Sequence, residues 1–159
     1  MENSVNETLQ RDSTASFQTD QLDYNLVSTP DGLEGEIPYV FTNSTQNPVY
    51  IVNCNGFTRL TLEKRTGDEW VKAWEPVMEA CLSEPIVVQP EQEYRAVIHV
   101  FAAHPANDID PKFLVDSVPG VYRLVWHSIL QNYDPNTYPF GEALPLEQRI
   151  SNYFRLDVQ

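Results

Sequence analysis

The segment Pro119-Gly-Val-Tyr-Arg-Leu-Val-Trp126 carries the clearest secondary-structure signal in the chain. A Pro-Gly pair, which is typical of a turn, precedes a run in which Tyr122, Leu124 and Trp126 occupy every second position. Because successive side chains of a β-strand point to opposite faces, this spacing predicts a strand with one large apolar face in a core. We therefore predict structural roles for Tyr122 and Trp126, with Tyr122 as a tyrosine corner whose hydroxyl bonds to nearby backbone.

Similar runs of strand length recur along the chain, each bounded by turn residues such as Asn55-Gly56. The predicted strands cover residues 22–28, 36–43, 48–54, 58–65, 69–75, 85–89, 94–101, 121–129 and 151–158. Within 69–75, the alternation places Trp70, Lys72 and Trp74 on one face. Short strands at this spacing, with no convincing helical period between them, predict an all-β sandwich or barrel.

The two ends of the chain differ in character. Residues 1–20 are polar, with Phe17 as their sole aromatic residue, and we predict a flexible tether there. Residues 21–159 are predicted to form one folded domain with no run of about 20 apolar residues that would span a membrane. The chain opens with Met-Glu-Asn-Ser and no leader, which indicates either a cytoplasmic protein or one whose leader has been removed.

The composition argues against several function classes. The formal net charge is −13, from 23 acidic and 10 basic side chains, and such a surface repels phosphate backbones and anionic lipid heads. We therefore expect no nucleic-acid partner, and we expect a monomer.

No phosphate-loop, dinucleotide, catalytic-serine or His-Glu-x-x-His pattern occurs, so we expect neither an enzyme nor a cofactor. Asn107, Asp108 and Asp110 offer oxygen atoms to calcium, but Asn and Asp also form ordinary turns, and we expect no metal.

The two cysteines, Cys54 and Cys81, lie in different connections between strands. Cys54 closes the third predicted strand, and Cys81 lies between the fifth and the sixth. If successive strands run up and down, both positions lie at the same end of the sandwich, and a Cys54–Cys81 disulfide is plausible. The alternative is two free thiols in a cytosolic protein. A lone pair in an all-β domain favours the disulfide, and with it an oxidising compartment.

Three segments resemble a known family. They are Tyr39-Val-Phe-Thr-Asn43 with Pro48-Val-Tyr-Ile-Val52, Leu62-Glu-Lys64 with Gly67-Asp-Glu-Trp70, and the segment that ends at Trp126. Together they resemble bacterial immunoglobulin-like domains of secreted proteins and lipoproteins, and they are distantly similar to the BsuPI proteinase inhibitors. The resemblance covers residues 36–158. It implies an immunoglobulin-like antiparallel β-sandwich and identifies no active site.

The candidate ligand surface is a group of aromatic residues, Tyr133, Tyr138 and Phe140, in the long connection 130–150. Exposed rings among polar neighbours suit contacts with protein or carbohydrate. The alternative is that the rings fold back and cover an open edge of the sandwich.

These observations together predict a non-catalytic binding or structural module of a bacterial envelope. We expect it to be extracytoplasmic, and lipid-anchored if a leader has been removed. A protein partner is one possible ligand and a carbohydrate is another, bound through the aromatic loop residues. The remaining alternative is a proteinase inhibitor that acts through a long loop.

Overall fold

The computed structural model describes residues 9, 15–78, 80–104 and 107–159. Its elements in chain order are β1 (Phe17–Thr19), β2 (Asp23–Ser28), β3 (Gly32–Thr42), β4 (Val49–Ile51), β5 (Leu60–Thr66), β6 (Glu69–Trp74), β7 (Ile86–Val88), β8 (Glu93–Ala103), β9 (Gly120–Trp126), β10 (Ile129–Leu130), α1 (Leu146–Arg149) and β11 (Phe154–Val158). The predicted all-β fold is confirmed, and each predicted strand corresponds to one of these elements. No helix in the described part of the chain is long and apolar enough to cross a membrane.

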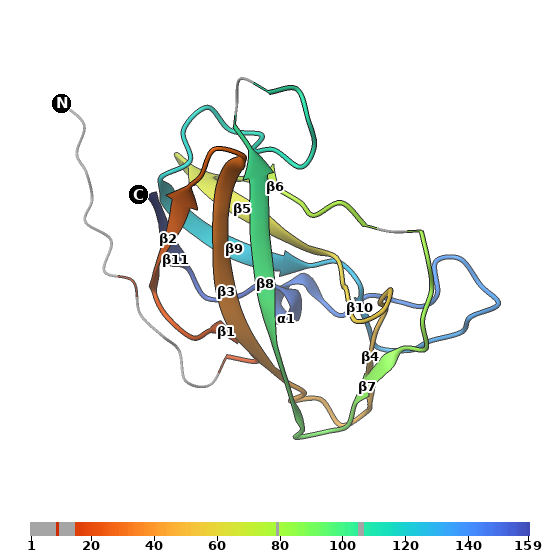
Figure 1. Cartoon of the computed structure of the whole chain (residues 1–159). Helices are drawn as coiled ribbons and strands as arrows, with labels where there is room; N and C mark the ends of the chain where they lie inside the picture. The colour runs from red at the N-terminus through yellow and green to blue at the C-terminus, as the bar shows by residue number, and fades with distance from the viewer. Residues whose placement is uncertain (1–8, 10–14, 79, 105–106) are drawn as a thin grey trace.

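Two layers of strands pack face to face as a sandwich (Figure 1). In the first layer, β3 pairs with β8 in antiparallel register from Gly32↔Ala103 to Thr42↔Glu93, and β1 and β2 pair with opposite ends of β3. The second layer has the order β2-β11-β9-β5-β6. Strand β2 belongs to both layers, because it pairs with β3 at one end and lies parallel to β11 over the rest of its length. A small sheet of β10, β4 and β7 extends the sandwich at one end.

The core is centred on Trp126, which is fully buried between the layers. The rings of Phe17, Tyr39, Phe41 and Tyr94 surround it, with centroids 5.5–5.8 Å from its own. All four pairs are tilted or edge-to-face, and aromatic quadrupoles favour such arrangements over a face-to-face sandwich. The indole Nε1 donates to Thr58 Oγ1 at 2.8 Å, so the one polar atom of this side chain is satisfied.

Tyr122 lies beside this aromatic core on β9, and its side chain is fully buried. Its hydroxyl donates a hydrogen bond to the carbonyl of Val118, four residues upstream. This is the contact expected of a tyrosine corner, with the ring in the core and the hydroxyl on the preceding backbone.

The N-terminal tether ends earlier than residue 20. Phe17–Thr19 form β1, which pairs with the end of β3, and the Phe17 side chain is only 1% exposed. Thr19 is also held by the side chain of Asn152, whose Oδ1 accepts its backbone N–H at 2.8 Å. A short strand with one aromatic residue lacks a local periodic signal, since its pairing with β3 is a tertiary contact. Residues 1–8 and 10–14 of the predicted tether lie outside the described residues.

The prediction that Trp70, Lys72 and Trp74 share one face of β6 is wrong. The register between β5 and β6 slips at Leu62/Glu63, so that one step on β5 spans two residues of β6. This β-bulge reverses the alternation. Trp74 therefore turns into the core, while Trp70 stays partly exposed with the Arg123 guanidinium 4.5 Å above its ring.

Candidate functional site

Strand β8 is a long edge strand. Among the described residues it pairs with β3 along one side and with no named strand along the other. Just beyond β3, Asn43 N–H donates to the carbonyl of Gln92 in the same register. The backbone N–H and C=O groups of the even-numbered residues of β8 therefore point towards β3, and those of the odd-numbered residues point away from it. In agreement, Phe101 and Ala103 make their hydrogen bonds on the opposite side, to Trp74 Nε1 and to the carbonyl of Pro111.

The rest of this free edge has no such cover. The backbone N–H and C=O groups of Arg95, Val97 and His99 point away from β3 by the same alternation. The backbone and side-chain hydrogen bonds of the described residues supply no partner for them on that side. An exposed row of strand amides is a template for another strand.

A cavity of about 290 Å³ opens between the two layers along this edge. Buried side chains form its floor, and exposed apolar ones form its rim. The lining residues are Tyr39, Gly56, Phe57, Thr58, Leu60, Trp74, Pro76, Val77, Met78, Ala96, Val97, Ile98, His99, Phe101 and Pro111. Phe57 and Val77 at the rim are 69% and 67% exposed. Two large apolar side chains held this far out of the core beside an open cavity mark a surface for contact.

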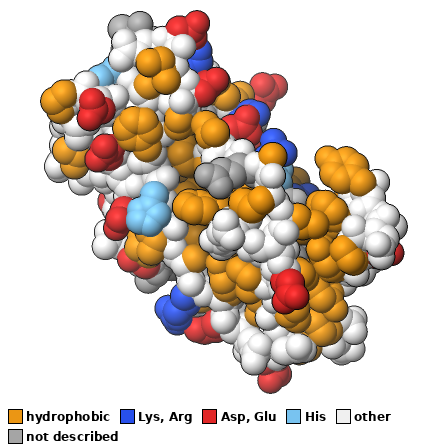
Figure 2. Space-filling view, turned by 45° about the vertical axis from the view of Figure 1, so that its right-hand side comes forward, with side chains coloured by type: hydrophobic (Ala, Val, Ile, Leu, Met, Phe, Trp, Pro, Cys, Tyr) orange, Lys and Arg blue, Asp and Glu red, His pale blue; other side chains and the backbone are white. Residues whose placement is uncertain are grey.

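Two further hollows adjoin the cavity. One shares Val97 with it and lies over the outer face of β3 and β8, where Pro38, Val40 and Arg95 line it. The other shares Val77 and Pro111 with it and extends to Leu114. The cavity and the second of these hollows lie beside the free edge, and together we call them the edge groove. Figure 2, turned to bring this side of the molecule forward, shows hydrophobic side chains gathered across the face.

The first wall of the edge groove is built by the Asn55-Gly56 turn. Asn55 and Gly56 have φ values of 50° and 88°, which is typical of the type I′ turn that Asn-Gly favours. Cys54 and Phe57 exchange two backbone hydrogen bonds of 2.9 Å across this turn. The turn thus ends at Phe57 and holds its ring at the mouth of the cavity.

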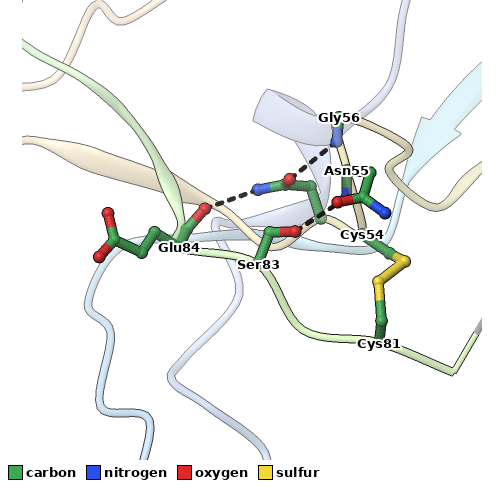
Figure 3. The surroundings of a disulfide bond; sticks show 7 residues. Cys54, Asn55, Gly56, Cys81, Ser83 and Glu84 are labelled. Carbon is green, nitrogen blue, oxygen red and sulfur yellow. Dashed lines mark hydrogen bonds between the residues drawn. A yellow bond between two sulfur atoms is a disulfide. The ribbon is translucent and has the colours of Figure 1, made fainter.

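A disulfide ties this wall to the second wall, the connection between β6 and β7 (Figure 3). The predicted Cys54–Cys81 disulfide is confirmed, with a Cα–Cα distance of 5.2 Å. The buried Asn53 adds two contacts, because its Nδ2 donates to the carbonyl of Glu84 at 3.0 Å and its Oδ1 accepts from Gly56 N–H at 3.0 Å. The covalent bond and the side-chain bridge together fix the spacing of the two walls.

Charged groups beside the second wall neutralise one another. Glu75 accepts from Lys72 Nζ at 3.1 Å and from Arg59 Nη2 at 3.2 Å, and these two cations hold the pKa of its carboxyl below the usual range. On the outer face of the β3–β8 pair, His99 Nδ1 lies 3.1 Å from Glu36 Oε1. The described residues that line the cavity are mostly apolar, and the titratable ones among them are His99 and Tyr39.

The three aromatic residues singled out in the sequence lie together outside the edge groove. Residues 131–142 project from β10 as a closed loop, where Asp134 N–H donates to the carbonyl of Phe140 at 2.7 Å. Tyr133 stacks on Tyr50 of β4, with ring centroids 6.1 Å apart, and Phe140 contacts both Tyr133 and Tyr138. Tyr138 is 90% exposed at the tip. The cluster therefore combines packing against the small sheet with one fully presented ring.

The loop with Asn107, Asp108 and Asp110 is held by a cation of the chain. Lys112 Nζ lies 2.7 Å from Asp108 Oδ1, and this contact lowers the pKa of the carboxyl. Among the described residues no group of three or more His, Cys, Asp or Glu side chains is placed to hold a metal ion.

Sequence reasoning missed the edge groove. Its local signals were present, since Asn55-Gly56 marks a turn and Phe57 and Val77 are apolar residues within connections. What the sequence lacks is any sign of which strand stands at an edge.

Comparison of the chain with protein-family models, with curated proteins and with solved structures finds no match. The resemblance to bacterial immunoglobulin-like domains therefore stays an interpretation of the sequence.

Proposed function

We propose that this chain is a non-catalytic binding module of an extracytoplasmic space, and that it holds a segment of a partner protein in the edge groove. The observation that carries the proposal is the open apolar cavity beside the uncovered stretch of β8. The immunoglobulin-like resemblance of the sequence adds the bacterial envelope as the setting.

The energetics favour a protein ligand at this surface. Covering a large apolar side chain contributes about 1.5–3 kcal/mol, and Phe57 and Val77 both stand largely in solvent. Aromatic and aliphatic side chains around a concave apolar surface, with charged groups at its margin, are typical of protein interfaces. The disulfide and Asn53 fix the spacing of the two walls, so the groove is preformed and a ligand has little reordering cost to offset.

The disulfide supports the extracytoplasmic setting. Disulfides persist in oxidising compartments and are rare in the cytosol. Here the Cys54–Cys81 bond joins both walls of the edge groove, so that the oxidised form is the one with a fixed binding surface.

The test is a display selection with random linear peptides on the immobilised, disulfide-bonded protein. Enriched peptides are expected to lose at least tenfold in affinity for the double variant Phe57→Ser, Val77→Ser. The matched control is Val27→Ser, because Val27 is a 51% exposed apolar residue of β2 that lines none of the three hollows. An absence of enriched peptides, or peptides that bind the double variant as tightly as the wild type, refutes the proposal.

A second candidate function is carbohydrate binding at the aromatic loop, and the exposure of Tyr138 favours it. Its ring is presented at the tip and supported from the side by Phe140, with centroids 5.8 Å apart. Flat aromatic faces beside polar groups suit sugar rings. A glycan array tests this candidate: signals that disappear in Tyr138→Ala support it, and an array with no signal above background removes it.

A further inference from the structure

We infer that the partner segment binds by adding a β-strand to the free edge of β8, and that it alternates apolar residues with Lys or Arg. This inference rests on the proposed function and names the partner chemistry of the same groove. It concerns the uncovered stretch around Arg95, Val97 and His99.

The backbone of β8 supplies the first part of the argument. At its upper end, the outward groups of Phe101 and Ala103 already have partners in Trp74 and Pro111. The outward N–H and C=O groups of Arg95, Val97 and His99 have no hydrogen-bond partner among the described residues, although they belong to the same regular, eleven-residue strand. Natural edge strands are usually short or protected by proline, bulges or inward charges. This stretch has a continuous register with β3 and contains no proline, so it offers an added strand a full set of donors and acceptors.

The inner face of an added strand would meet the cavity. Every second side chain of a strand on this edge points between the two layers, towards Leu60, Trp74 and Ile98. The volume of about 290 Å³ is roughly twice that of a 150 Å³ cavity that binds benzene. It therefore suits two apolar side chains two residues apart, such as Leu, Ile, Val or Phe.

The outer face of an added strand would meet negative charge. The outward side chains of β3 and β8 include the carboxylates Glu34, Glu36 and Glu93 and one guanidinium, Arg95. Arg95 is paired with Glu93 at 2.8 Å, and Glu36 contacts the imidazole of His99 at 3.1 Å. Glu34 and Glu36 therefore have no Lys or Arg partner among the described residues. They lie two strand spacings, about 10 Å, from an added strand, a gap that long cationic side chains reach across. The net charge of −13 acts in the same direction over a longer range.

Two libraries of synthetic nine-residue peptides test the charge pattern. In both, Val, Leu, Ile or Phe occupies every second position, and the intervening positions carry Lys and Thr in one library and Glu and Thr in the other. The best peptides of the Lys library are expected to bind at least tenfold more tightly than those of the Glu library, with a difference that shrinks in high salt. Equal affinities overturn the basic part of the inference.

Hydrogen bonding along the edge is tested on both molecules. N-methylation of the bound peptide, one position at a time, is expected to weaken binding at least tenfold at every second residue and to have little effect between them. On the protein, Val97→Pro removes an outward N–H that takes no part in pairing with β3, and edge strands tolerate proline there. We expect at least a tenfold loss for Val97→Pro and less than a threefold loss for Val97→Ala, which keeps the N–H.

Amide hydrogen exchange of the wild-type protein gives a readout that does not depend on a variant's folding. Binding is expected to slow exchange at the N–H groups of Val97 and His99 at least tenfold. Peptides that require Phe57 and Val77 but show neither this protection nor a period of two in the N-methyl scan overturn strand addition and leave the proposed function standing. Failure of all peptides to bind overturns both.

Discussion

Removal of the disulfide is the perturbation whose size the structure defines best. We consider the double variant Cys54→Ala, Cys81→Ser, in which the buried sulfur is replaced by a small apolar group and the exposed one by a hydroxyl. The bond closes a loop with a sequence separation of 27. In the chain-entropy model, a loop of this length lowers the entropy of the unfolded chain enough to stabilise the fold by about 3.5 kcal/mol.

This loss is large enough to measure in two ways. For a chain of this size each kcal/mol shifts the Tm by about 2–4 °C, so the variant is expected to melt roughly 7–14 °C lower. Urea unfolding followed by Trp fluorescence is expected to show a free energy of unfolding about 3.5 kcal/mol lower than that of the wild type. The fluorescence spectrum of the folded variant is expected to change little, because the core around Trp126 does not involve the disulfide.

The control is reduction of the wild-type protein. Reductant is expected to destabilise the wild type by an amount similar to the double substitution and to leave the variant unchanged. If the variant unfolds within about 1 kcal/mol of the oxidised wild type, the entropic reasoning is refuted. Amide hydrogen exchange is the second readout. If the Phe57 N–H exchanges no faster in the variant than in the wild type, the disulfide does not hold the first wall of the edge groove.

Three other substitutions test the core and the pH dependence. Tyr122→Phe leaves the carbonyl of Val118 without its donor and is expected to cost about 1–3 kcal/mol in urea unfolding, against no measurable loss for Tyr153→Phe at the surface; equal losses contradict the tyrosine corner. Phe17→Ala is expected to lower the free energy of unfolding by about 3–5 kcal/mol in the same assay. A loss below 1 kcal/mol would show that Phe17 belongs to the N-terminal tether and not to the core. Partial desolvation of the ring and the nearby Arg59 and Arg149 lower the pKa of His127, so the unfolded chain binds the proton more readily. Stability is therefore expected to fall as the pH drops below about 6.5, and His127→Gln should flatten that part of the urea-stability profile; an unchanged slope contradicts this cause.

The sequence by itself determined the fold class, because the alternation of apolar residues is a local property of each strand. The Tyr122–Trp126 pattern marks a strand with one buried face, and the structure buries those side chains. The turn at Asn55-Gly56 was predictable for the same reason, since both residues adopt positive φ at low cost. The disulfide followed from counting connections between strands, which needs no knowledge of how the layers pair.

The binding surface was decided by tertiary structure alone. Whether a strand is central or at an edge depends on what lies beside it. Nothing within residues 93–103 records that, among the described residues, β8 has β3 on one side and no strand on the other. The bulge that turns Trp74 inward depends on the register with β5 in the same way. The residues of the edge groove come from connections far apart in the chain, which meet because the Cys54–Cys81 bond and the side chain of Asn53 join them. A pattern along one strand cannot encode such a meeting, because the free energy that holds it belongs to contacts between segments.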